Sequence, residues 1–300
     1  MGYLFLTISV FCGAVKGFCG KKTSGFVNTY ADAMKTNIIR MILCMLIGLI
    51  MIAFQNNIAM LKINSNVLFI SALSGLSTSV FVVSWIVSVK KGAYMMLDVF
   101  LMLGVLVTIC LSAAFFKESV KLVQWLGFAL LTLSVIIMCS YNNSVKEKIT
   151  FSSFVLLLIA GVSSGLTDFS QKLFVNSAPD CSKAVFNFYT YVFSAVTLFV
   201  FCITFKLKNK NGAEPDAAPL KVKTIFGYVF VMSVCLFLNS YFKTLAAAHL
   251  TAAQLYPLCQ GTSLALSAVM SALFFKERLT AKCVSGIVLA FFSLLIINLL

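Results

Sequence analysis

The sequence predicts an all-α membrane protein with ten transmembrane helices arranged as two inverted five-helix repeats. Three observations support this fold class: the composition, a series of long apolar runs, and a motif that occurs twice. The 300-residue chain is 61% hydrophobic and only 11% charged, and its mean hydropathy is +1.01. A water-soluble surface cannot be built from so few charges, so the excess apolar residues require lipid as their solvent.

Ten apolar runs have the length of roughly 20 residues that a helix needs to cross the hydrocarbon core. The connections between them are short, except for a segment between Lys206 and Lys223 that contains Gly212, Pro215 and several charges. Such a composition indicates an exposed loop and leaves the rest of the chain as one compact bundle. The expected spans are 2–20, 35–54, 67–89, 93–116, 121–141, 151–172, 184–205, 223–244, 250–275 and 280–299.

The first of these runs begins at the N-terminus. Residues 1–10 contain no basic residue, and no small-residue cleavage site follows before Lys16 and Lys21. A secretory signal needs a basic beginning and such a cleavage site. We therefore expect residues 2–20 to form the first membrane helix.

A duplicated motif divides the ten runs into two sets of five. Phe115–Glu118 returns as Phe274–Glu277 after 159 residues, and Gly17–Lys21 resembles Asp168–Lys172 at a spacing of 151 residues. The first motif closes the fourth run and the ninth, so each copy contains five helices. An odd number of crossings inserts the second copy in the opposite direction. The expected repeats cover residues 1–145 and 146–300.

The net charge of +14 does not indicate a nucleic-acid partner. The cations lie mainly between the apolar runs and form no continuous basic face, which is typical of contact with anionic lipid headgroups. More lysines fall on the side opposite the two termini than on the side of the termini. The positive-inside rule therefore favours an orientation with both termini outside the cell.

Cysteine and histidine usage argues against a metal site and against catalysis. The ten cysteines are scattered without a C-x-x-C pair, so they form no disulfide framework and are expected to pack as small polarizable side chains. His249 is the single histidine, and no Ser or Cys motif marks it as a catalytic base. We expect no enzymatic activity, no catalytic residues, no metal and no cofactor.

Ionisable residues inside membrane spans are costly and point to functional sites. Lys16, Asp98 and Asp168 lie within the first, fourth and sixth spans. Lys16 and Asp168 occupy nearly equivalent positions in the two repeats, so the inverted symmetry would bring them to opposite sides of a central path. A structural alternative is that Asp98 or Asp168 pairs with Lys16 and only locks helices together.

Three further cations have expected roles at the membrane boundary. Arg40 lies near the start of its span and is expected to extend its guanidinium to the headgroups. Lys172 and Lys243 lie toward the ends of their spans and are expected to anchor them at the interface. Glu118 and Glu277 are interpreted as turn and capping residues at the start of the following helix.

Polar and aromatic residues beside the buried charges could contact a ligand or only other helices. Asp98 shares a helix face with Tyr94, four residues before it. Tyr256 and Gln260 lie four apart beside Pro257, and their polar groups must bond either neighbouring helices or a ligand. Trp85 is expected either in an interfacial aromatic belt or at a binding site. Small residues around Ser71, Gly75 and Ser77, and around Ser263, Ser267 and Ser271, predict close helix contacts.

Several segments resemble one known superfamily. They are Ala252–Gln254, Gly261, Phe274–Leu279, Gly286 and Ile296–Leu300, and together they are similar to the drug/metabolite transporter superfamily. The ten-helix EamA-like members carry such an ending in each half. The resemblance covers nearly the whole chain.

The resemblance implies more than the residues alone. Family members usually have Gly where this chain has Lys117 and Lys276 before the glutamates, and they usually have cytoplasmic termini, contrary to the lysine distribution. It implies a secondary transporter working by alternating access, with helices one, three, four, six, eight and nine lining the path. We expect export of a small amino acid-like or amphipathic metabolite across the plasma membrane by a monomer or homodimer.

The alternatives are a multidrug or organic cation exporter and a non-transporting membrane scaffold. A proton is a possible coupling ion, carried by Asp98 or Asp168, and lipids are the other expected partners besides the substrate. The candidate substrate-binding residues are Lys16, Trp85, Tyr94, Asp98, Asp168, Tyr256 and Gln260.

Overall fold

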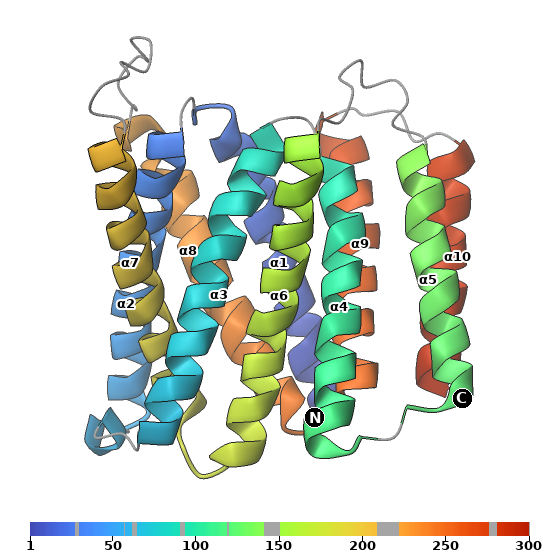
Figure 1. Cartoon of the computed structure of the whole chain (residues 1–300), viewed down its shortest axis with the longest axis horizontal. Coiled ribbons are helices and arrows are strands. Elements are labelled where there is room, and N and C mark those ends of the chain that lie inside the picture. The colour runs from blue at the N-terminus through green and yellow to red at the C-terminus, as the bar shows by residue number, and fades with distance from the viewer. Residues whose placement is uncertain are drawn as a thin grey trace.

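The computed structural model describes residues 1–27, 30–56, 58–61, 65–90, 94–118, 120–140, 151–208, 222–275 and 281–299. Within these residues ten long α-helices lie side by side (Figure 1). They are α1 (Gly2–Ser24), α2 (Tyr30–Phe54), α3 (Ser65–Lys90), α4 (Tyr94–Phe116), α5 (Leu122–Ser140), α6 (Phe151–Ser177), α7 (Lys183–Lys208), α8 (Val222–Ala247), α9 (Ala252–Phe275) and α10 (Ala281–Leu299). A short 3-10 helix, η1 (Ile58–Leu61), precedes α3.

Each of the ten expected spans overlaps one of these helices, so the all-α prediction is confirmed. Among the described residues, five helices are both long enough and apolar enough to cross a membrane: α1, α2, α3, α7 and α8. Parts of α4, α5 and α10 form shorter apolar helices over Gly104–Phe116, Leu122–Ser134 and Val284–Ile297. Several helices extend beyond the apolar runs that predicted them. Charged residues expected at the ends of the spans therefore lie further inside the helices.

The helix contacts made by one repeat recur in the other repeat. Exchanging α1–α5 with α6–α10 turns the contact of α1 with α8 into that of α6 with α3, and both contacts are extensive. The same exchange relates α4·α6 to α9·α1 and α3·α7 to α8·α2, while α2·α7, α5·α10 and α4·α9 map onto themselves. Both termini lie at the same end of the bundle (Figure 1). The architecture is therefore two inverted repeats, and the expected boundary at 145–146 lies outside the described residues.

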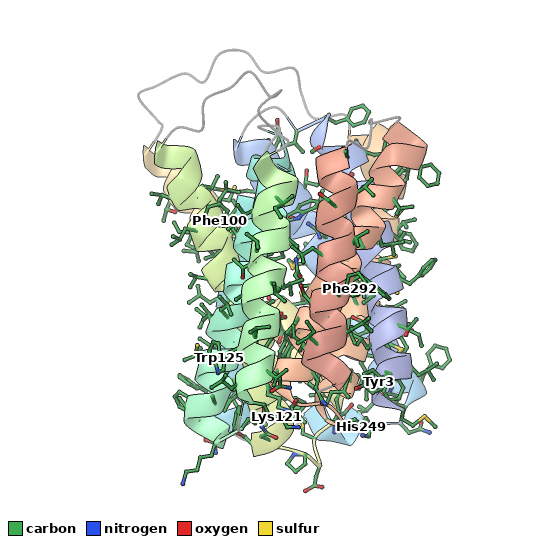
Figure 2. All side chains as sticks on the ribbon, turned by 90° about the vertical axis from the view of Figure 1, so that its right-hand side faces the viewer. Tyr3, Phe100, Lys121, Trp125, His249 and Phe292 are labelled. Carbon is green, nitrogen blue, oxygen red and sulfur yellow. The ribbon has the colours of Figure 1, made fainter. Side chains whose placement is uncertain are left out.

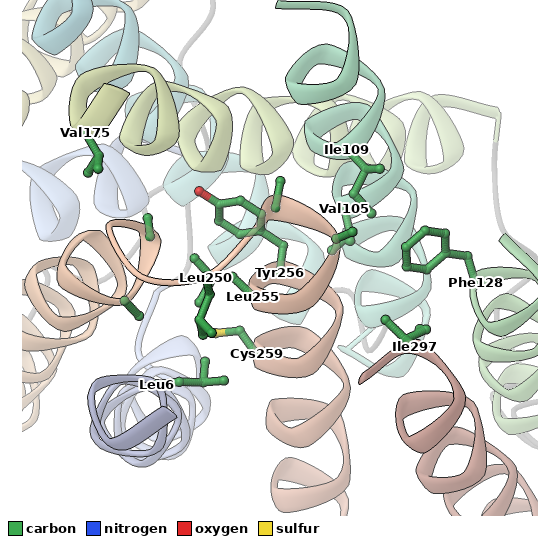
Figure 3. Close-up of a cluster of buried hydrophobic side chains, with 14 of the residues drawn as sticks. Leu6, Val105, Ile109, Phe128, Val175, Leu250, Leu255, Tyr256, Cys259 and Ile297 are labelled. Carbon is green, nitrogen blue, oxygen red and sulfur yellow. The ribbon is translucent and has the colours of Figure 1, made fainter. Parts of the chain in front are cut away.

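The pair α5·α10 lies at one edge of the bundle, and α2·α7 lies at the opposite edge (Figure 1). Large apolar side chains cover the outer face of α5 and α10, among them Trp125 and Phe292, which Figure 2 shows at this face. An exposed apolar face of this kind is typical of a surface that contacts lipid or another protein. An apolar cluster joins this edge to the centre, and Phe128, Ile297, Val105 and Tyr256 belong to it (Figure 3).

Glycines bring the helices of the centre into backbone contact. A Cβ atom on Gly161 of α6 would overlap the carbonyl oxygen of Phe100, and Gly104 of α4 lies equally close to Gly165. The Thr108 hydroxyl also donates to the Gly165 carbonyl at 2.9 Å, which ties α4 to α6. Close approach of this kind is how membrane helices associate without a hydrophobic driving force.

The close contact predicted around Gly75 is confirmed. A Cβ atom there would lie 2.6 Å from the Thr190 carbonyl oxygen of α7. One turn along α3, the Ser79 hydroxyl lies 2.9 Å from that of Ser194. Around Ser263 the second predicted contact cannot be traced in full, because the side chains of Ser267 and Ser271 lie outside the described residues.

Candidate functional site

Four ionisable residues from both repeats form what we call the central cluster: Lys16 on α1, Arg40 on α2, Asp168 on α6 and Lys243 on α8. The Lys243 ammonium donates to the Asp168 carboxylate at 2.6 Å, and both side chains are largely buried. An ion pair removed from water needs such geometry, because the attraction has to offset the lost hydration of both charges. The interfacial role expected for Lys243 is therefore wrong.

Lys16 is the member of the central cluster for which the described residues provide no direct partner. It is partly buried and lies close enough to Lys243, Arg40 and Asp168 for their charges to act on it. Lys243, and not Lys16, is the residue that pairs with the Asp168 carboxylate. Among the side chains that the structure describes, no hydrogen bond or ion pair reaches the Lys16 ammonium.

Arg40 is only 2% exposed, so its expected extension to the lipid headgroups is wrong. Its Nη1 donates to Asn37 Oδ1 at 2.5 Å. The Asn37 amide is held in turn, because its Nδ2 donates to the carbonyl oxygens of Ala33 at 3.0 Å and Val82 at 3.4 Å. Arg40 Nε is buried, and no described residue forms a hydrogen bond with it. The helix explains this depth, since α2 begins at Tyr30 and places Arg40 about 15 Å along its axis.

A chain of neutral polar groups continues from Asp168 along α6. Gln171 Nε2 donates to the Ser240 hydroxyl at 3.0 Å, and that hydroxyl donates to Asn187 Oδ1 at 2.5 Å. The oxygen of the same amide, Gln171 Oε1, is buried and has no hydrogen-bond partner in the described part of the chain. Nearer the middle of α8, Asn239 Nδ2 donates to the Ser9 carbonyl oxygen at 2.7 Å. These bonds connect α6, α7 and α8 and join α8 to α1.

Sequence reasoning missed these neutral polar residues. Their signal was available, because an amide inside an apolar run must find a partner within the bundle. Reasoning from ionisable groups alone therefore found Lys16 and Asp168 but overlooked Asn37, Gln171, Asn187 and Asn239.

A second group, which we call the terminal-side network, lies at the end of the bundle that holds both termini. The Lys172 ammonium pairs with Glu118 Oε1 at 3.0 Å and donates to the carbonyl oxygens of Leu250 at 2.8 Å and Ala247 at 3.3 Å. The other carboxylate oxygen accepts a bond from the Ala252 backbone N–H at 2.9 Å. Lys172 is buried, so its expected role as a lipid anchor is wrong.

Glu118 caps a different helix from the one expected. It accepts the first N–H of α9, whereas the start of α5 is capped by Gln124, whose Oε1 accepts the Lys121 N–H at 3.1 Å. Lys117 ends α4 with a φ of 53°, a left-handed conformation that glycine adopts without strain. This backbone explains why the resembling family usually has Gly at this position. The second copy of the motif, Lys276 and Glu277, lies outside the described residues.

The aromatic candidates make structural contacts. The Trp85 ring lies against Gly20, where an added Cβ atom would overlap it, and it packs against the buried cluster that contains Phe100 and Leu157. Trp85 therefore faces the interior of the bundle and not the lipid. The Tyr256 hydroxyl points toward α6 (Figure 3) and donates to the Asp168 carbonyl oxygen at 2.7 Å, so it bonds a neighbouring helix.

Three candidates have less defined surroundings. Gln260 on α9 is partly buried, and within the described part of the chain no hydrogen bond involves its amide. Tyr94 and Asp98 belong to the first turns of α4, but their side chains lie outside the described residues. The structure thus brings together Lys16, Asp168 and Tyr256, and adds Arg40 and Lys243 to them.

Ten helices in two inverted repeats, with charges buried at their centre, define an integral multi-pass membrane protein of the transporter class. The model of the EamA-like transporter family matches residues 1–140 and 151–299. The chain belongs to this family, which is part of the drug/metabolite transporter superfamily.

Comparison with solved structures supports the same fold. One crystal structure of another protein covers 99% of this chain and 96% of its own, with a TM-score of 0.72 and 12% sequence identity. Identity this low shows the fold alone. The comparison with curated proteins gave no match.

Proposed function

We propose that this protein is a secondary active transporter that moves a small metabolite through the central cluster by alternating access. The observation that supports this function best is the origin of the cluster. Lys16 and Arg40 come from the first repeat, and Asp168 and Lys243 come from the second. A site at the interface between inverted repeats is reached from either side when one repeat rocks against the other.

Paired contacts at the two ends of the bundle fit this motion. Phe115 of α4 contacts Phe169 of α6 with ring centroids 5.4 Å apart, and Phe274 of α9 contacts Phe18 of α1 at 5.2 Å. The duplication relates these two pairs, and inversion puts them toward opposite ends of the bundle. Each pair would close one side of the path, with the terminal-side network strengthening the closure beside Phe115.

The two repeats differ in how tightly the related helices pack. Backbone contact through Gly161 and Gly165 joins α6 to α4, whereas the equivalent positions on α1 are Val10 and Ala14, where α1 meets α9 less extensively. Alternating access requires two halves in different conformations that exchange during transport. The unequal packing of α4·α6 and α1·α9 is consistent with one such state.

The proposed direction is export across the plasma membrane, with a proton as the coupling ion. Asp98 and Asp168 are the proposed proton carriers. Asp168 would have to release Lys243 before accepting a proton, so protonation and helix movement would be linked. Trp85, Tyr94 and Gln260 are proposed to complete the substrate site.

Flux into proteoliposomes tests this function. The purified protein is reconstituted and offered labelled amino acids, organic acids, nucleosides and organic cations, with and without a pH gradient. Saturable flux that falls in Asp168→Asn establishes transport through the cluster, and a response to the gradient that Asp98→Asn or Asp168→Asn removes establishes proton coupling. The lipid-facing variant Phe292→Leu is the control for reconstitution. Absence of flux for the whole panel, in protein that remains folded, would favour the scaffold alternative.

A further inference from the structure

The charges of the central cluster do not balance. Lys16, Arg40 and Lys243 are three cations, and Asp168 is the one carboxylate among the described side chains that lies close to Lys16 and Lys243. Since Lys243 and Asp168 neutralise each other at 2.6 Å, the charges of Lys16 and Arg40 remain without a counter-charge among the described side chains. A charge without a counter-charge at this depth is costly in a membrane protein and is kept where it has a function.

We propose that Lys16 and Arg40 bind the anionic group of the substrate, so that the transported metabolite is an organic anion carrying a carboxylate or a phosphate. This proposal rests on the proposed transport function and names the substrate class for that site. Carboxylates and phosphates are the groups that Arg and Lys recognise by charge-assisted hydrogen bonds.

Arg40 has the features of a prepared anion ligand. Its guanidinium is fixed by Asn37, which the carbonyl oxygens of Ala33 and Val82 hold in place. Its Nε donor is buried and has no acceptor among the side chains and backbone groups that the structure describes. A buried donor without an acceptor loses its bond to water and gains none, so a ligand oxygen placed there would recover that loss.

Lys16 supplies the second, more adaptable contact. It lies eight residues before the end of α1, which is about 12 Å along the helix axis and within the hydrocarbon core. The Lys16 and Arg40 charges act on each other. Repulsion between two cations is relieved when an anion lies between them, and the flexible lysine stem allows the ammonium to follow the bound group.

The same charges disfavour the alternative substrate classes. An organic cation entering the cluster would meet Lys16 and Arg40, and Asp168 is already engaged by Lys243. A neutral solute would leave both cations uncompensated. The structure therefore favours organic anions over the organic cations of a multidrug exporter.

Matched ligands test the inference. Thermal unfolding of the purified protein is measured with inorganic phosphate and with a panel of organic acids and phosphate esters. Each is paired with the amide, alcohol or amine of the same carbon skeleton. We expect at least one anion to raise the unfolding temperature where its neutral and cationic counterparts do not. Stabilisation by the amides or amines equal to that by the anions, or by none of the probes, would overturn the inference.

Variants assign the binding to the two cations. Lys16→Met is expected to weaken binding of the stabilising anion by at least about tenfold, the equivalent of one lost charge-assisted hydrogen bond. Arg40→Lys keeps the charge but removes the guanidinium, and we expect a similar loss. Lys35→Met removes a charge from a side chain that is 52% exposed and should leave binding unchanged. Equal affinity in Lys16→Met and in the unmodified protein would contradict the site.

The anion-binding measurement and the flux assay can fail independently of each other. Anion binding without flux would support this site and contradict the transport function. Flux of a neutral or cationic compound that does not depend on Lys16 would support transport and contradict the anionic substrate.

Discussion

The central cluster and the terminal-side network both place lysines and a carboxylate inside the bundle, but only one of them is complete. In the terminal-side network, the three N–H donors of the Lys172 ammonium are matched by three acceptor oxygens, and each carboxylate oxygen of Glu118 accepts a bond. In the central cluster, Arg40 Nε has no hydrogen-bond partner among the described residues, and neither has Gln171 Oε1, three residues beyond Asp168 on α6. A satisfied network fixes a structure, whereas an incomplete one at the centre of a transporter is where a ligand can supply the missing groups.

Two charged residues of the same helix, α6, therefore have different expected roles. Asp168 and Lys172 are one turn apart on α6. Asp168 belongs to a group that both repeats build, and Lys172 ties α6 to the end of α8 and the start of α9. Removing Lys172 should therefore reduce stability, and removing Lys16 should reduce binding.

The largest effect is expected from Lys172→Met. This change leaves a carboxylate and two carbonyl oxygens without their shared donor, and we expect a loss of about 3 kcal/mol in the free energy of unfolding. Thermal and denaturant unfolding in detergent measure it, with Lys35→Met as the exposed control. In the double variant with Glu118→Gln, part of the loss should return because no charge is left unpaired. A loss in Lys172→Met no larger than in Lys35→Met would contradict the structural role of the network.

The contact of α4 with α6 supports both the central cluster and the terminal-side network, because α6 carries Asp168 and Lys172. Gly161→Ala places a Cβ atom against the Phe100 carbonyl oxygen and should destabilise the protein by about 2 kcal/mol through overpacking. The matched control is Gly227→Ala, where the added atom meets open space. That variant should gain about 0.5 kcal/mol from helix propensity. Similar unfolding temperatures for the two variants would disagree with the backbone contact.

Lys16→Met is expected to change stability little while it removes binding. Loss of a partly buried charge that has no described counter-charge should leave the free energy of unfolding unchanged or raise it by up to about 1 kcal/mol. Unfolding without ligand and with the stabilising anion gives both quantities from one experiment. A large loss of stability without ligand would mean that Lys16 has a structural partner and would remove the contrast with Lys172.

The smallest effect is expected at Lys117, beside the terminal-side network. A lysine with a φ of 53° is strained, and Lys117→Gly should stabilise the protein by about 0.5 kcal/mol. The unfolding temperature measures the gain, and transport should not change. Destabilisation would show that the Lys117 side chain, and not its backbone, supports the turn.

The sequence predicted the ten helices and their inverted repeats because apolar length and the duplicated motif depend on local residue order. It also predicted Lys16 and Asp168 as central residues. It was wrong for Arg40, Lys172 and Lys243, which it assigned to the membrane boundary. An apolar run stops at a charge, whereas the helix does not: α6 continues to Ser177 and α8 to Ala247. Depth therefore depends on the true helix ends and on the neighbours that supply counter-charges.

The partners of these charges could not be predicted for a related reason. Lys243 reaches Asp168 from a helix 75 positions away in the chain, and Glu118 caps α9 and not the helix that follows it. Such pairings depend on how the two repeats pack against each other. The duplication specifies which helices correspond, but it does not specify which side chains meet.

Flux of the stabilising organic anion in proteoliposomes tests the central claim most directly, with Lys16→Met compared against the unmodified protein. The incomplete central cluster predicts saturable flux that falls by at least about tenfold in Lys16→Met, the counterpart of one lost charge-assisted contact, although the variant remains folded. Equal flux in both proteins would contradict a substrate site at Lys16.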